Sequence, residues 1–267
     1  MTTIPPRPDR PAYEKTVVME LTGGGLGNQM FQFAFGLAVA RALNAPYEWV
    51  RGPHRVGREF GLGMFGIEEQ QFYMPQTVYQ NPGCGNSHDL YRTIQTVQES
   101  SHMHCGIRGH FQREECFASV NVEIRDAIFK IEPIKLFPNQ VSLQIRRGDY
   151  VGSKLYDVCG PRYYWDAISH FNEKGSPMFV VVSDDLEWCR KTFAGYPYVH
   201  VPESQTAEEG LRLMAGSESH IISNSTYGWW GAWLSGGTTI VPDRWLNGKW
   251  KGHTWDCAPE RWIRIPT

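Results

Sequence analysis

The sequence lacks the features that mark several classes of protein. No apolar run approaches the roughly 18–20 residues that a transmembrane helix needs. Residues 1–15 contain no apolar segment of the kind found in a secretory signal peptide. Charge of one sign is not in excess, since 26 Lys and Arg face 28 Asp and Glu with no long run of either. These absences exclude a strongly basic surface for nucleic acid or membrane lipid.

Paired cysteines are also missing. The six cysteines are scattered and form no C-x-x-C motif, which favours reduced, mostly buried thiols over a disulfide framework. His102, His104, Cys105 and His110 do not have the regular, paired spacing of a zinc site. We therefore expect a soluble, cytoplasmic protein without a metal centre.

The chain has enough length and apolar content for a sizeable core. Its 267 residues, 41% of them apolar, fit one large domain or two small ones. The proline-rich start predicts a flexible leader over residues 1–16. Two prolines that frame a predicted strand place a boundary between an N-terminal α/β domain, residues 17–135, and a C-terminal domain, residues 136–267.

Strands and helices alternate along much of the sequence. Residues 17–21 form a short apolar run, and a glycine loop leads from it into an apolar segment over 28–43 that predicts a buried helix. In the C-terminal half, alternating strands and helices are typical of a parallel sheet covered on both faces. The strands are expected at residues 141–145, 179–182, 198–201, 220–223 and 238–241. Residues 45–135 are less regular.

The chemically informative residues follow the predicted strands, at the edge where parallel sheets bind ligands. In the loop Gly23–Gln29, glycines allow a ligand to approach the backbone, and amides at a helix N-terminus favour an anion. A tight turn that serves helix packing explains the loop equally well. It matches neither the dinucleotide pattern G-x-G-x-x-G nor a Walker A loop.

Two arginines, Arg146 and Arg147, leave the strand predicted at 141–145. Guanidinium groups at a strand end need an anionic partner, and their fork suits a phosphate. Asp149 is expected to orient one arginine or to accept a proton from a substrate hydroxyl. The alternative is an internal Arg–Asp ion pair that braces the turn.

Two further strand ends carry hydroxyl, amide and acidic groups. Residues 223–226, Ser-Asn-Ser-Thr, open a helix and form either a phosphate cradle or simple N-caps. Residues 183–185, Ser-Asp-Asp, suit Mg²⁺ or helix capping, and we favour capping.

Seven of the 10 tryptophans lie after Ser225. We interpret Trp229, Trp230 and Trp233 as the core face of a helix rather than as a sugar platform. The later tryptophans are expected to pack back on the N-terminal half rather than to stack on a sugar.

Three of these segments together resemble the motifs of the α-1,2-fucosyltransferases of glycosyltransferase family 11. They are GGGLGNQMF at 23–31, IRRGDY at 145–150 and SNSTYGWWGAWL at 223–234. VVSDD at 181–185 is similar to a fourth, less specific motif. The matches span residues 18 to 242, in the order that the family has.

The resemblance implies a GT-B-like fold: two Rossmann-type halves with parallel sheets and a cleft between them. It also implies GDP-fucose as donor, inversion at the anomeric carbon, a galactose O2 acceptor and no obligatory metal. Arg146 would contact the β-phosphate, and a fixed cation there neutralises charge on the departing diphosphate. Arg147 and Asp149 would organise the cleft. The other residues assigned to the donor are Gly25, Gly27, Asn28, Gln29, Gln144, Ser183, Asp184, Glu209, Asn224, Ser225 and Thr226.

The chain departs from the family at two positions. Gln144 stands where the family usually has His, and Gly210 stands where it usually has Asp. In the wider superfamily these positions lie near the guanine, so Glu208 or Glu209 would have to supply the missing acceptor. Otherwise the donor is another nucleotide-sugar.

The general base is open, with Asp149 and Asp157 as candidates on the loop after the arginine pair. A non-catalytic carbohydrate-binding protein on the same fold is the second interpretation of the chain. An NAD-dependent oxidoreductase is disfavoured, because the third glycine of its motif is missing.

Overall fold

A computed structural model describes residues 3–21, 24–52, 59–70, 74–81, 83–173, 175–249 and 255–267. The chain divides into two compact units, Met1–Lys130 and Ile131–Thr267. The division lies close to the boundary predicted after residue 135. Each unit is an α/β structure around one all-parallel sheet, which confirms the predicted fold class.

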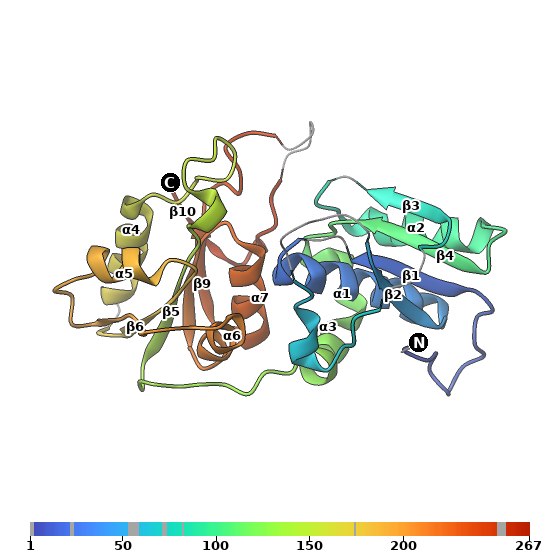
Figure 1. Ribbon diagram of the computed structural model, residues 1–267, viewed down its shortest axis with the longest axis horizontal. Coiled ribbons are helices and arrows are strands. Elements are labelled where there is room, and N and C mark those ends of the chain that lie inside the picture. The colour runs from blue at the N-terminus through green and yellow to red at the C-terminus, as the bar shows by residue number, and fades with distance from the viewer. Residues whose placement is uncertain are drawn as a thin grey trace. The chain divides into compact units, whose positions relative to one another are not determined.

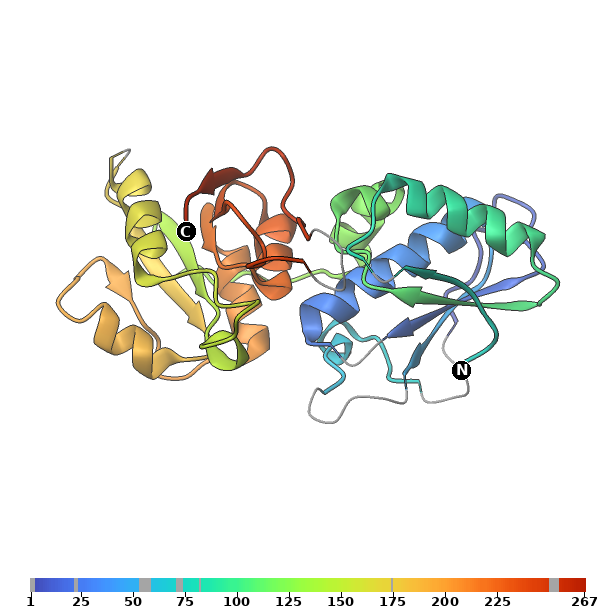
Figure 2. The same ribbon diagram turned by 90° about the horizontal axis from the view of Figure 1, so that it is seen from above.

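Unit 1 (Met1–Lys130) has a four-stranded sheet in the order β2-β1-β4-β3. Figure 2 shows α1 and α2 on one face of this sheet. The strands are β1 (Thr16–Leu21), β2 (Tyr47–Arg51), β3 (Thr77–Asn81) and β4 (His104–Gly109), and the helices are α1 (Leu26–Leu43), α2 (Ser87–Glu99) and the short α3 (Asn121–Glu123). Short 3-10 turns cover Leu62–Phe65, Glu114–Cys116 and Ala118–Val120, and a π turn covers Ile124–Ile128.

Helix α1 is apolar on almost every side, as its sequence predicts. Its residues from Gln29 to Ala40 are all buried. The helix ends at Asn44, which adopts the left-handed conformation with a φ of 54°. An asparagine tolerates this conformation better than most residues.

The leader contacts unit 1 at several points. Ile4 forms an antiparallel bridge with Tyr47. The Asn44 amide donates to the carbonyls of Arg10 and Pro11, at 3.1 and 2.8 Å. The Arg41 guanidinium donates to the carbonyl of Pro5 at 2.7 Å. Residues predicted as a flexible leader are thus tied to the start of β2 and the end of α1.

Unit 2 (Ile131–Thr267) has a six-stranded sheet in the order β10-β9-β8-β5-β6-β7. Figure 1 shows the sheet between α4 and α5 on one side and α6 and α7 on the other. The strands are β5 (Gln140–Ile145), β6 (Met178–Ser183), β7 (Val199–His200), β8 (Ser219–Ile222), β9 (Thr238–Pro242) and β10 (Ile263–Ile265), and the helices are α4 (Pro161–Asn172), α5 (Leu186–Thr192), α6 (Ala207–Ala215) and α7 (Thr226–Ser235). A 3-10 turn covers Gly148–Tyr150.

The strand order of unit 2 is the doubly wound order of a Rossmann fold. The chain steps outward from β5 to β7 on one side, then restarts at β8 and steps outward to β10 on the other. The order therefore reverses between β5 and β8, and ligands bind doubly wound sheets in the crevice at that reversal. In unit 1 the central neighbours are β1 and β4, and the chain reaches the edge strand β3 before it returns to β4.

The tryptophans of the C-terminal half are mostly core, as predicted. Trp229, Trp230 and Trp233 are at most 1% exposed and pack on one another. Trp262 contacts Trp229, with ring centroids 5.5 Å apart, so its packing partner is α7 of its own unit. Strand β10 joins the tail to β9 within the same unit, and the packing of the later tryptophans on the N-terminal half stays a prediction. Trp250 lies outside the described residues.

Candidate functional site

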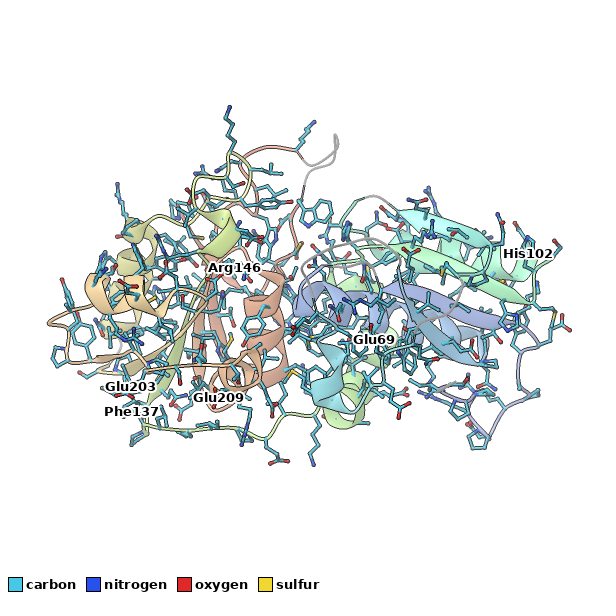
Figure 3. All side chains as sticks on the ribbon, in the orientation of Figure 1. Glu69, His102, Phe137, Arg146, Glu203 and Glu209 are labelled. Carbon is cyan, nitrogen blue, oxygen red and sulfur yellow. The ribbon has the colours of Figure 1, made fainter. Side chains whose placement is uncertain are left out.

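The carboxyl ends of β5, β6 and β8 bring the predicted motifs of unit 2 together. The backbone N–H of Arg146, just after β5, donates to the Ser223 hydroxyl after β8 at 2.8 Å. The backbone N–H of Arg147 donates to a carboxylate oxygen of Asp184, after β6, at 2.8 Å. Figure 3 shows Arg146 at this end of the sheet. The loops predicted to carry the chemistry therefore form one site.

The Arg146 guanidinium is engaged on both of its terminal nitrogens. Nη1 pairs with Asp184 Oδ2 at 2.9 Å, and Nη2 pairs with Asp149 Oδ1. The guanidinium also lies over the Tyr150 ring, 5.2 Å from its centroid. The ion pair considered as an alternative to phosphate binding is thus present.

The Arg147 guanidinium is held differently. Its Nε donates to Asp185 Oδ2 at 2.9 Å, and its carbon lies 4.0 Å from the centroid of the Trp188 ring. Asp185 Oδ1 accepts a hydrogen bond from the Trp188 N–H and caps α5. The capping role preferred for this acidic segment is confirmed for Asp185. The Trp188 amide and the Arg147 guanidinium lower the pKa of Asp185.

Asp184 links the two arginines. One of its oxygens accepts from the Arg147 backbone, and the other pairs with the Arg146 side chain. This close approach needs Gly148, because a Cβ there would overlap the Asp184 carboxylate. Ser183 supports the turn, since its hydroxyl accepts from the Asp185 N–H at 3.0 Å. In total, two guanidinium groups face three carboxylates at this site.

Two residues assigned to the donor hold the loops instead of facing outward. Both N–H groups of the Asn224 amide donate to backbone carbonyls, of Tyr156 at 3.1 Å and of Trp245 at 2.9 Å. Gln144 is 3% exposed, and its Oε1 accepts from the Ser223 N–H at 3.1 Å. These side chains fix the positions of the strand-end loops.

Ser225 and Thr226 begin helix α7. Ser225 is the N-cap residue and is 5% exposed. Within the described part of the chain, its hydroxyl makes no capping hydrogen bond to α7. The capping alternative is therefore wrong for Ser225, and the phosphate-cradle interpretation stays a prediction.

Glu209 and Asp157 have structural partners. The Glu209 carboxylate accepts from the Thr206 N–H at 2.7 Å in a capping box that starts α6, and this bond lowers its pKa. Figure 3 shows Glu209 well apart from Arg146. Asp157 accepts from the Gly152 N–H at 2.9 Å and so closes the loop that follows the arginine pair.

Gly210 is packed too tightly for the family's usual aspartate. A Cβ at this position would overlap the Tyr227 hydroxyl and lie 2.9 Å from Val182. The Tyr227 hydroxyl donates to the carbonyl of Ala207 at 2.6 Å. Tyr227 therefore fills the space that a side chain at position 210 would need.

In unit 1, amide side chains lie at the loops that follow β1 and β4. Asn28 Oδ1 accepts from Gln112 Nε2 at 2.9 Å. Gln29 donates to the carbonyls of Gly24 and Glu59, at 3.0 and 2.9 Å, and so secures the glycine loop. Gly25 is the N-cap residue of α1, with open space beside its Cα, and Gly27 is buried in the first turn. Gly23 lies outside the described residues.

Sequence reasoning missed three residues of these sites. Gln112 lies in the irregular region and is 84 residues from its partner Asn28. Tyr150 is the last residue of a recognised motif and Trp188 lies just after another, and only their contacts with Arg146 and Arg147 reveal their roles. An aromatic residue three positions into a capped helix was the available signal for Trp188.

The described ranges contain no group of three or more His, Cys, Asp or Glu placed to hold a metal ion. All six cysteines are free, and five are buried. No described helix is both long and apolar enough to cross a membrane.

The chain is similar to known glycosyltransferases. Alpha-1,2-colitosyltransferase from Escherichia coli is 28% identical over 288 residues, which cover 94% of this chain and 99% of that protein. Galactoside 2-alpha-L-fucosyltransferase Sec1 from Mus musculus is 34% identical over 114 residues, 38% of this chain and 30% of that protein. The crystal structure of fucosyltransferase NodZ from Bradyrhizobium superposes with a TM-score of 0.48 at 13% identity, covering 82% of this chain and 93% of that one. The family model of glycosyl transferase family 11 matches residues 68–263, so the chain belongs to this family, as its motifs predict.

Proposed function

We propose that this protein transfers L-fucose from GDP-fucose to a hydroxyl of a glycan, O2 of galactose, with inversion at the anomeric carbon. The arginine pair at the strand-order reversal of unit 2 carries the proposal, because it supplies fixed positive charge where a Rossmann sheet binds a nucleotide. The family membership and the fucosyltransferase name of the mouse relative support this choice of reaction and acceptor.

In this mechanism the diphosphate of the donor competes with Asp149 for the Arg146 guanidinium. The guanidinium forms ion pairs with Asp149 and Asp184. Asp149 is the more exposed of these partners, with 54% of its side chain accessible against 28% for Asp184. The β-phosphate displaces Asp149 from Nη2, so that Arg146 stabilises charge on the leaving diphosphate without an obligatory metal ion.

Displacement leaves the Asp149 carboxylate available as a general base. An acceptor hydroxyl must lose its proton as the new glycosidic bond forms, and a carboxylate within hydrogen-bond reach accepts it. Asp157 is less suited, because its carboxylate closes the 152–157 loop. We assign acceptor binding to unit 1 and place the reaction in the cytoplasm, where the donor would be available.

A colitose donor is the second candidate. The relative that covers most of the chain is named a colitosyltransferase, and the departures at Gln144 and Gly210 lie in positions associated with the donor base. In either case a GDP-linked sugar is the expected donor class.

Isothermal titration of the protein with GDP, UDP and ADP tests the nucleotide. We expect GDP to bind about tenfold more tightly than the other two, since base recognition rests on hydrogen bonds to guanine. Equal affinities for the three nucleotides would exclude a GDP-linked donor. Incubation with GDP-fucose and GDP-colitose in parallel, followed by mass spectrometry of the products, then separates the two sugar candidates.

A further inference from the structure

The two arginines of the site use different edges of their guanidinium groups. Both terminal nitrogens of Arg146 pair with carboxylates. Arg147 uses Nε for Asp185, and no described residue accepts a hydrogen bond from its Nη1 or Nη2. Because a guanidinium binds phosphate through paired N–H groups on one edge, the Nη edge of Arg147 is the one available to an anion.

Helix α5 fixes this orientation from two sides. The Asp185 carboxylate accepts from the Trp188 N–H at 3.0 Å with one oxygen and from Arg147 Nε at 2.9 Å with the other. The Trp188 ring covers the face of the same guanidinium at 4.0 Å. A planar cation held at one edge and on one face keeps only its opposite edge for a ligand.

The Trp188 ring also packs against the apolar core of unit 2. Its aromatic neighbour there is Phe193, at a centroid distance of 6.5 Å. Trp165 contacts the same Phe193 more closely, at 5.1 Å, and also contacts Tyr196. Trp165 is therefore a tryptophan of the same apolar layer that touches neither arginine in the described contacts.

We propose that Trp188 is a positioning residue that, together with Asp185, holds Arg147 so that its Nη edge is presented to the diphosphate of the donor. The inference rests on the proposed function of unit 2 as a nucleotide-sugar site. Arg147 is then the preformed half of the diphosphate site, and Arg146 is the half that must first release Asp149. Neither the family motifs nor the sequence assign Trp188 a role.

The test compares Trp188→Leu and Trp188→Phe with Trp165→Leu as the matched control. In the ligand-free protein, we expect the Nε–H signal of Arg147 in a ¹⁵N NMR spectrum to be shifted by the Trp188 ring current. This shift should vanish in Trp188→Leu, persist in part in Trp188→Phe and remain in Trp165→Leu. An unchanged Arg147 signal in Trp188→Leu would overturn the proposal.

Titration with GDP gives the second readout. We expect the affinity to fall about three- to tenfold in Trp188→Leu, less in Trp188→Phe, and not in Trp165→Leu. In an Arg147→Ala background, Trp188→Leu should cause no further loss, because its effect passes through Arg147. An equal loss in both backgrounds, or a lower melting temperature with unchanged affinity, would assign Trp188 to packing alone.

Failure of the proposed function can be distinguished from failure of the inference on Trp188. A wild-type protein that binds neither GDP nor inorganic diphosphate would remove the nucleotide site and this inference with it. If the wild-type protein binds GDP and Trp188→Leu leaves the affinity for GDP unchanged, only the role proposed for Trp188 is excluded.

Discussion

The loops that follow the central strands of the two units present different chemistry. In unit 2, the loops after β5 and β6 carry two guanidinium groups and three carboxylates. In unit 1, the loops after β1 and β4 present the amides of Asn28 and Gln112, joined by a 2.9 Å hydrogen bond. Guanidinium groups suit a diphosphate, and neutral amides suit the hydroxyl groups of a sugar. Two all-parallel sheets thus support two kinds of recognition through their loops.

The largest expected effect comes from removing a charge in unit 2. Arg146→Ala should lower the transfer rate about 10²- to 10³-fold, because a fixed cation at the leaving group is lost. Arg162→Ala is the matched control, since Arg162 lies in the same unit with its side chain 92% exposed. Steady-state rates and a melting curve of each variant provide the measurement. A turnover rate of Arg146→Ala within about threefold of wild type would contradict the role assigned to the positive charge in unit 2.

The second prediction concerns a buried histidine that unit 2 has in its core. His220 Nε2 donates to the Gly236 carbonyl at 2.8 Å, so Nδ1, 2.7 Å from the Ser142 hydroxyl, is the unprotonated nitrogen. Burial lowers the pKa of His220 from 6.5 to about 4. As the pH falls, His220 takes up its proton near pH 6.5 in the unfolded chain but only near pH 4 in the folded protein. Stability of unit 2 should therefore drop by about 3 kcal/mol between pH 6.5 and 4.

Urea unfolding at several pH values checks this loss. His220→Gln should be less stable at neutral pH but should show a shallower decline toward acid, because the titrating ring is gone. His200→Gln, in partly exposed strand β7, is the control and should keep the wild-type slope. An equally steep acid decline in His220→Gln would show that another group of the protein is responsible.

The third prediction uses the position at which the chain departs from its family. Gly210→Asp should cost about 1–3 kcal/mol of unfolding free energy, because the new side chain overlaps the Tyr227 hydroxyl. Adding Tyr227→Phe should recover part of this cost. Gly160→Asp, at an N-cap position with open space beside it, should cost nothing. Full stability of Gly210→Asp alone would mean that position 210 accepts the family's residue without rearrangement.

The smallest effect is expected from the amides of unit 1. Gln112→Ala should lower the transfer rate about three- to tenfold, because Asn28 loses a partner that orients it. Its affinity for GDP should stay within about twofold of wild type. Titration and kinetics on the same preparation separate these outcomes. A loss of GDP affinity that matches the loss of rate would instead support the donor role that the family resemblance implies for Asn28.

Part of this arrangement could be predicted from the sequence. The β-branched runs, the apolar segment of α1 and the arginines at a strand end follow from local patterns, and the structure has β5, β6 and α1 where they were expected. The hydrogen-bond partners of individual polar side chains could not be predicted from such patterns. Asn224 and Gln29 occur in the recognised motifs, yet both donate to backbone carbonyls that lie in separate loops.

The contacts that the sequence did not predict were missed for physical reasons. A hydrogen bond between residues 84 positions apart, such as that of Gln112 and Asn28, leaves no local pattern. The capping role of Glu209 could have been predicted, because Thr206 and Glu209 have the spacing of a capping box. The conformation of the tail depends on β10, a three-residue strand too short to show a period.

The most direct test of the account is whether the protein transfers a sugar from a GDP-linked donor. Purified protein incubated with GDP-fucose and a galactose-terminated oligosaccharide should give a product heavier by one deoxyhexose, detected by mass spectrometry, together with free GDP. GDP-colitose in place of GDP-fucose should be used in a parallel reaction. Absence of transfer and of donor hydrolysis with both donors would contradict the account and favour a non-catalytic carbohydrate-binding protein.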